Sequence, residues 1–291
     1  MSRFPAPVLA SGVPEPTPLH RGGSGTPLVL LHGLGLSWRI WRPVLPALEA
    51  RHAVLALTLP GHRGARPVGR RQPVDVASLT DAIEALLDDA DLDSPHVAGN
   101  SLGAWVALEL ARRGRACSVT AFSPAGAWRT PLDLWRLHLA LGLGSRTLPI
   151  FRLYALQPQL RRLLLLSLLE RGDRMPGPEA VELLADLRSC TIIDRLLWAG
   201  WTDGQLRQME RNACRIHIVW GGRDRILPFR RHATPLSALV PHVDIAVLPG
   251  VGHIPMYDDP ALVASTILDV TNEVDAGEHQ TGCGPTTGGP T

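Results

Sequence analysis

Lysine is absent from this chain of 291 residues, so all 29 of its basic residues are arginine. Its 27 acidic residues leave a formal net charge of +2, well below the strongly basic balance of a dedicated nucleic-acid-binding protein. We therefore expect no nucleic-acid partner. The missing lysine is typical of GC-rich coding and indicates no mechanism.

Cysteine is scarce, and its positions lack the spacing of a disulfide framework or a zinc site. No C-x-x-C pair occurs, and the 11 histidines show no clustered ligand spacing. We expect a reducing compartment, no metal and no cofactor. The four cysteines are Cys117, Cys190, Cys214 and Cys283.

Long hydrophobic runs are missing as well. Leu163–Leu169, one of the longest, falls well short of the ~20 residues that span a bilayer. Residues 1–26 contain five prolines and lack the continuous apolar stretch of a signal peptide. These features favour a soluble, cytoplasmic protein without a membrane span.

Glycine and proline, in contrast, are abundant and separate short apolar segments from helical patterns in regular alternation. This alternation predicts an α/β fold, in which a mostly parallel central sheet carries helices on both faces. We expect strands at 27–31, 53–59, 96–98, 118–122, 215–220 and 243–248, and helices at 76–87, 102–113, 229–239 and 260–271.

One long interval interrupts this alternation. Residues 127–208 show no strand pattern, while leucine, arginine and tryptophan recur at helical spacing. The chain length gives a prior of about two domains, and we predict the second as an all-helical insertion at 127–208 within a core of 1–126 and 209–275. Residues 276–291 are rich in Gly, Thr and Pro and are expected to be a disordered tail.

A candidate nucleophile lies at a predicted strand-to-helix turn. Residues 96–103 read H-V-A-G-N-S-L-G, so that G-x-S-x-G joins a strand to a helix. A serine at such a turn has a strained backbone, and Gly99 and Gly103 remove side chains that would keep strand and helix apart. The amino end of the helix directs free N–H groups at developing negative charge. The motif therefore singles out Ser101.

A second motif, L-H-G-L-G at residues 31–35, follows the first strong strand. Together with the serine motif it resembles the α/β-hydrolase superfamily, in the serine-nucleophile branch with a helical lid that includes esterases, lactonases and C–C hydrolases. The resemblance extends over about residues 27–271. It implies an α/β-hydrolase fold with 127–208 as the lid, and an oxyanion hole formed by the backbone N–H groups of Leu34 and Leu102.

The family order places an acid and then a histidine after the serine. The segment W-G-G-R-D-R offers Asp224 and the segment G-V-G-H-I-P offers His253, each after a predicted strand. The resemblance implies that His253 takes the Ser101 proton, that Asp224 fixes the imidazole, and that Ser101 forms an acyl-enzyme that water hydrolyses. The family's other acid position, here residues 123–126, holds no carboxylate.

Other polar residues near these motifs have structural interpretations. His32 and His62 are interpreted as histidines that shape their loops. Thr58 stands where the family usually has an acid before L-P-G, which predicts a local change of packing. The basic loop, residues 63–71, contains Arg63, Arg66, Arg70 and Arg71; a solvated loop is favoured over contact with an anionic substrate.

Four large side chains are candidates for the substrate pocket: Trp128, Trp198, Trp201 and Met256. If they face Ser101, the pocket is apolar and suits a hydrophobic substrate. Ordinary packing of the helical insertion is an equal alternative, because aromatic residues at helical spacing are usually core.

The function expected from the sequence is hydrolysis of a carboxylic ester, a lactone or a thioester. One alternative is C–C bond hydrolysis of a diketone-type metabolite, which the G-N-S-L-G motif also resembles, although Ala104 and Ile254 depart from that subgroup. Another is a ligand-binding member of the fold without hydrolytic activity. The natural substrate, the mobility of the lid and the oligomeric state stay open.

Overall fold

A seven-stranded sheet lies at the centre of the computed structural model, which describes residues 16–128, 130, 132, 133, 135, 137, 154–202, 205–209, 214–241, 243 and 245–281. The strand order is β1-β3-β2-β4-β5-β6-β7, with β1 antiparallel to β3 and all other pairs parallel. The strands are β1 Leu19–Gly22, β2 Thr26–Leu31, β3 His52–Leu57, β4 His96–Asn100, β5 Ser118–Phe122, β6 Arg215–Gly221 and β7 Ile245–Leu248. The mostly parallel sheet predicted from the sequence is confirmed.

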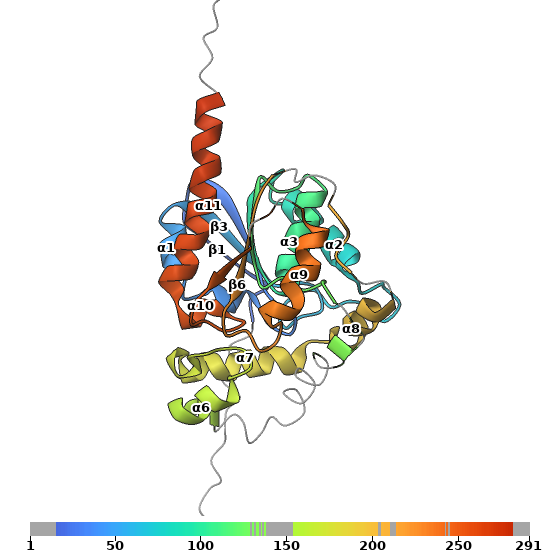
Figure 1. Ribbon diagram of the computed structural model, residues 1–291, viewed down its shortest axis with the longest axis vertical. Helices are drawn as coiled ribbons and strands as arrows, with labels where there is room; N and C mark the ends of the chain where they lie inside the picture. The colour runs from blue at the N-terminus through green and yellow to red at the C-terminus, as the bar shows by residue number, and fades with distance from the viewer. Residues whose placement is uncertain are drawn as a thin grey trace, which may run out of the picture.

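Helices cover both faces of this sheet (Figure 1). One layer contains α2 (Val76–Asp88), α3 (Leu102–Arg112) and α9 (Phe229–Leu239); the other contains η1 (Trp38–Trp41), α1 (Leu45–Glu49), α10 (Pro255–Asp258) and α11 (Pro260–Thr281). Each layer buries its own apolar cluster against the sheet, because the strands are apolar on both sides. The arrangement is the predicted α/β fold.

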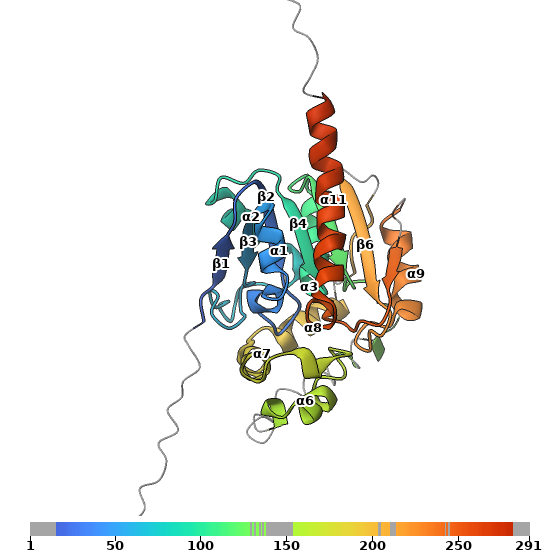
Figure 2. The same ribbon diagram turned by 90° about the vertical axis from the view of Figure 1, so that its left-hand side faces the viewer.

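Every regular element that the structure describes between β5 and β6 is a helix. This interval contains α6 (Pro158–Leu164), η2 (Gly172–Arg174), α7 (Gly177–Ser189) and α8 (Ile193–Thr202), and none of its described residues belongs to a strand. Figures 1 and 2 show these helices below the sheet. We call this interval the helical insertion; its role as a lid and its limits at residues 127 and 208 stay predictions.

The carboxyl end of the chain requires a correction. Helix α11 ends at Thr281 and projects beyond the body of the molecule (Figures 1 and 2), so residues 276–281 are helical although they were expected to belong to a disordered tail. Helix formers such as Ala276 and Gln280 still lie within this stretch, and the run rich in Gly, Thr and Pro begins only at residue 282. The rest of the predicted tail, 282–291, lies outside the described residues. No helix among the described residues has the length and apolar character needed to cross a membrane.

Candidate active site

Ser101 occupies the strained turn that the motif predicts. It lies between β4 and α3 with φ 56° and ψ −111°, a backbone conformation that costs a non-glycine residue about 1–3 kcal/mol. A Cβ on Gly99 would approach Gly103 O to 2.4 Å, and one on Gly103 would approach Leu31 O to 2.3 Å. Glycine is therefore required at both positions for β4, α3 and β2 to pack this closely.

Asp224 and His253 follow the adjacent strands β6 and β7 and meet directly. His253 Nδ1 and Asp224 Oδ2 are 2.7 Å apart, and both residues are buried. Asp224 Oδ1 accepts hydrogen bonds from the backbone N–H groups of Ile226 at 2.9 Å and Leu227 at 2.7 Å. Because both carboxylate oxygens are occupied, the acid is fixed in the orientation that receives Nδ1–H and leaves His253 Nε2 as the acceptor nitrogen.

Ser101 and His253 both line one cavity of about 570 Å³, measured out to its open mouth. Leu34 and Leu102, whose N–H groups the family resemblance assigns to the oxyanion hole, line the same cavity. The remaining described lining residues are mostly apolar: Gly33, Leu36, Trp105, Ala125, Trp128, Leu137, Leu168, Leu196, Leu197 and Ile226. The sequence-predicted nucleophile, base and oxyanion turn thus share one apolar cavity.

The turn that carries Leu34 is shaped by a buried histidine. His32 Nδ1 donates to Gly33 O at 2.7 Å, and its Nε2 accepts from Leu59 N–H at 2.9 Å. His62 lies against it with the ring centroids 4.7 Å apart, and its Nδ1 donates to Leu59 O at 3.1 Å. The contacts of both histidines agree with a loop-shaping role.

The four candidate pocket residues separate in the structure. Trp128 lines the cavity and packs edge-on against Trp105 at 6.5 Å. Trp198 is 71% exposed and lines a separate surface depression beside residues 73–75, because the one-residue step from the inward-facing Leu197 turns it toward solvent. The side chain of Trp201 lies outside the described residues.

Met256 also departs from the expectation. It is fully buried in the apolar cluster on the α10–α11 side of the sheet and is not among the described residues that line the cavity. The reason is local: α10 begins at Pro255, two residues after His253, and its first turn directs Met256 into that layer. The insertion supplies Leu168, Leu196 and Leu197 to the cavity, and no sequence pattern distinguished these leucines from its others.

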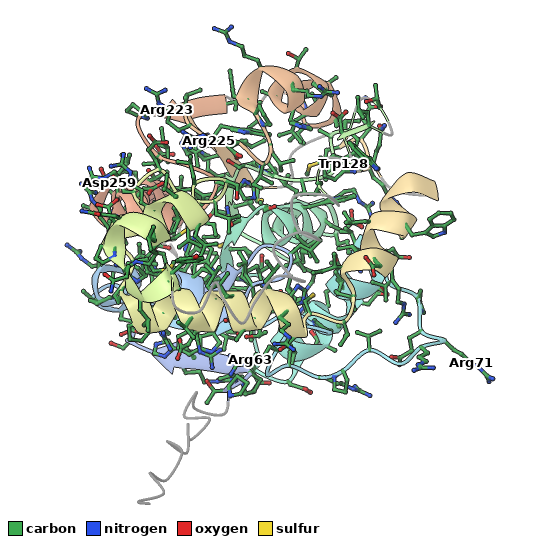
Figure 3. The ribbon with its side chains drawn as sticks, turned by 90° about the horizontal axis from the view of Figure 1, so that it is seen from below. Arg63, Arg71, Trp128, Arg223, Arg225 and Asp259 are labelled. Atoms are coloured by element: carbon green, nitrogen blue, oxygen red, sulfur yellow. The ribbon has the colours of Figure 1, made fainter. Side chains whose placement is uncertain are left out.

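None of the described residues that line the cavity belongs to the basic loop. Arg63 forms an ion pair of 2.9 Å with Asp186 of α7, so it holds the insertion to the core. Arg66, Arg70 and Arg71 are exposed. Figure 3 shows Arg71 at the edge of the molecule, far from Trp128.

Asn100 is a site residue that the sequence did not identify. Its Nδ2 donates to the backbone carbonyl of His253 at 2.9 Å and so connects the strand before Ser101 to the loop of His253. The two residues are 153 positions apart. The only sequence feature that pointed to Asn100 was its place at the first variable position of G-x-S-x-G.

Burial of His32 and His62 predicts a loss of stability in acid. Desolvation lowers the pKa of His62 to about 4 and holds that of His32 well below 6.5, whereas the unfolded chain binds protons near 6.5. The unfolded state therefore binds more protons below pH 6.5, and the free energy of unfolding should fall between pH 6.5 and about 4. The linked slope is about 1.4 kcal/mol per pH unit for each histidine.

Urea unfolding at several pH values in that range measures this slope. The matched variant is His62→Gln, which keeps a donor for Leu59 O but does not titrate. It should reduce the slope of the unfolding free energy with pH by up to the contribution of one histidine. Equal slopes for the variant and the wild type would refute the assignment to His62.

Comparison with known proteins agrees with this architecture. The sequence model of the alpha/beta hydrolase family matches residues 28–266, and the chain belongs to this family. The family is a class of hydrolases, in agreement with the strained turn at Ser101 and with the Asp224–His253 pair that follows β6 and β7.

Individual relatives cover several chemistries. The chain is 33% identical over 212 residues to the epoxide hydrolase EphH of Mycobacterium tuberculosis, covering 68% of this chain and 95% of that protein. It is 27% identical over 280 residues to 2-hydroxymuconate semialdehyde hydrolase of a Pseudomonas species, covering 92% and 94% of the two chains.

Solved structures resemble it in fold. The 2-hydroxy-6-oxo-6-phenylhexa-2,4-dienoate hydrolase of Rhodococcus sp. strain RHA1 superposes with a TM-score of 0.68 at 20% identity, covering 87% of this chain and 94% of that one. The enol-lactonase of Burkholderia xenovorans LB400 gives 0.66 at 17% identity, with coverages of 87% and 95%.

Proposed function

We propose that this hydrolase cleaves a carboxylic ester, lactone or thioester through an acyl-enzyme on Ser101. The observation that carries the proposal is the shared cavity of Ser101 and His253, with His253 Nδ1 held by Asp224 at 2.7 Å. This arrangement matches the nucleophile, base and orienting acid of covalent acyl transfer.

The proposed chemistry uses Ser101, His253, Leu34 and Leu102, which all line the cavity. His253 Nε2 accepts the Ser101 proton as Oγ attacks the substrate carbonyl, and the imidazolium is stabilised by Asp224. The backbone N–H groups of Leu34 and Leu102 stabilise the oxyanion, at about 2.7–4 kcal/mol for each donor. The imidazolium then protonates the leaving alcohol or thiol, and water, deprotonated by His253, releases the acid.

The nucleophile separates this reaction from epoxide opening, the activity in the name of one relative. A carboxylate that attacks an epoxide forms an ester, which water hydrolyses in a second step. Serine attack on an epoxide would form an ether, which water does not cleave under these conditions. Ser101 therefore favours acyl substrates.

The lining of the cavity favours acyl substrates over the C–C alternative. The related C–C hydrolases are named for muconate and dienoate compounds, which carry a carboxylate. Arginine is absent from the described lining residues, so they offer no cationic partner for such a group. An uncharged, apolar acyl or alkyl group fits this lining better. We assign the helical insertion as the lid over this group, because Leu168, Leu196 and Leu197 come from it.

A panel of substrates tests this proposal. Nitrophenyl esters of increasing chain length should give kcat/KM values that rise beyond the acetate, because each buried methylene adds about 0.8 kcal/mol of transfer free energy. The panel also contains a lactone, a thioester and a carboxylate-bearing vinylogous diketone, with Ser101→Ala as the blank. A maximum at acetate would contradict the apolar pocket. Preferred cleavage of the diketone would establish the C–C reaction, and a lack of turnover with all four classes would support the ligand-binding alternative.

A further inference from the structure

The loop of His253 is held at three consecutive residues. Gly252 N–H donates to Asp258 Oδ2 at 2.7 Å, Asn100 Nδ2 donates to the carbonyl of His253, and Ile254 N–H donates to Leu168 O at 2.9 Å. The first and third of these bonds are independent of the serine motif. One ends on a buried carboxylate and the other on the helical insertion.

Asp258 is that buried carboxylate, and it connects the loop of His253 to the helical insertion. Its Oδ2 also accepts from Glu170 N–H at 3.0 Å, and its Oδ1 accepts from Arg171 N–H at 2.7 Å. The residue is only 2% exposed, and burying a charged group is costly unless hydrogen bonds compensate it. Three backbone N–H groups supply that compensation here, one from the catalytic loop and two from the insertion.

The same stretch of the insertion contacts the loop of Asp224. We call Leu166–Arg171 the anchor segment. Arg225 Nη1 donates to Leu166 O at 3.1 Å and lies 2.8 Å from Glu170 Oε2. Figure 3 shows Arg225 and Asp259 on the same side of the molecule. Leu168 of this segment lines the cavity, so the anchor segment contacts both catalytic loops and the substrate space.

We propose that Asp258 is a positioning residue that aligns His253 with Ser101 only while the anchor segment is docked. The helical insertion thereby controls the base as well as covering the substrate. This inference rests on the proposed serine mechanism. It assigns the alignment to Asp258, which touches neither the substrate nor the reacting atoms and acts through the Gly252 N–H.

Asp258→Asn is the direct test. The amide keeps the size of the side chain, but its Nδ2 cannot accept a hydrogen bond, so at least one N–H among those of Gly252, Glu170 and Arg171 loses its acceptor. We expect kcat to fall about 10- to 100-fold, because a misplacement of the base by about 1 Å is enough for such a loss, while KM stays within about threefold. The rate at which a fluorophosphonate labels Ser101 should fall in parallel.

A second variant disrupts the contact between the anchor segment and the loop of His253 while leaving Asp258 unchanged. A Cβ on Gly252 would lie 2.8 Å from Leu168 O and 3.0 Å from Glu170 N, so Gly252→Ala displaces the anchor segment from the loop. It should reproduce the loss in kcat and in labelling. The matched control is Asp259→Asn, because Asp259 Oδ1 accepts from Leu262 N–H at 3.0 Å and asparagine serves equally well as a helix N-cap.

The outcomes separate the two proposals. Wild-type protein that neither reacts with the fluorophosphonate nor hydrolyses esters would overturn the proposed function. If the wild type is active and Asp258→Asn keeps its kcat and labelling rate, only the positioning role is overturned. A fall in kcat that Asp259→Asn shows to the same extent would also overturn only that role. If Asp258→Asn does not fold, as judged by its thermal unfolding transition, Gly252→Ala decides by the same criteria.

Discussion

Ser101→Ala is expected to lower kcat for ester hydrolysis by at least about 10⁴-fold and to abolish labelling by a fluorophosphonate. The loss is this large because no acyl-enzyme can form without the Oγ nucleophile, and only the binding and oxyanion contributions to catalysis remain. Intact-protein mass spectrometry reports the adduct directly. Steady-state kinetics with a nitrophenyl ester gives kcat.

Ser101→Ala should remove the hydroxyl without changing the backbone of the turn. Alanine keeps a Cβ, so the strained φ of 56° at position 101 is unchanged, and thermal unfolding should differ little from that of the wild type. Ser265→Ala is the matched control, because Ser265 is exposed on α11 and its Oγ bonds only within its own helix, to Leu262 O at 3.0 Å. An adduct that persists in Ser101→Ala would place the nucleophile elsewhere.

The parallel sheet could be predicted because its strands are buried on both faces and read as continuous apolar runs. β1 was missed, since a four-residue edge strand with the sequence L-H-R-G and no fully buried position shows neither a run nor an alternation. The positions of Ser101, Asp224 and His253 at strand ends followed from motifs whose spacing is local. The cavity shared by Ser101 and His253, and the contact of His253 with Asp224, required the strand order β4-β5-β6-β7, which no local pattern contains.

The pocket was harder to predict, because helical periodicity gives the width of an apolar stripe and not the partner it faces. Leu197 and Trp198 are neighbours in sequence, yet the first lines the cavity and the second is exposed. Met256 was assigned to the pocket because it is close to His253 in sequence, although α10 directs it into the apolar cluster beside α11 and away from the described cavity lining. Asn100 and Asp258 hold the loop of His253 by hydrogen bonds to its backbone carbonyl and N–H groups. Every residue has such backbone groups, so the sequence gives no pattern from which these contacts could be predicted.

Asp224→Asn should lower kcat by about 10⁴-fold while leaving the fold nearly unchanged. The asparagine Oδ1 can still accept the N–H groups of Ile226 and Leu227, so the loop after β6 keeps its hydrogen bonds. The Nδ2 group then faces His253 Nδ1 at the place of the carboxylate Oδ2, 2.7 Å away in the wild type. Two donors cannot share this contact, so the imidazole carries its proton on Nε2 and offers Ser101 no acceptor.

This mechanism separates a catalytic role of Asp224 from a merely structural one. If the carboxylate fixes the tautomer, kcat and the rate of fluorophosphonate labelling fall together while the midpoint of thermal unfolding shifts by only a few degrees. Asp269→Asn on the exposed side of α11 removes the same charge far from the cavity and should leave kcat unchanged. A variant Asp224→Asn with wild-type kcat would show that His253 does not depend on this acid, and a loss of activity that only tracks a loss of folded protein would reduce Asp224 to a loop-stabilising residue.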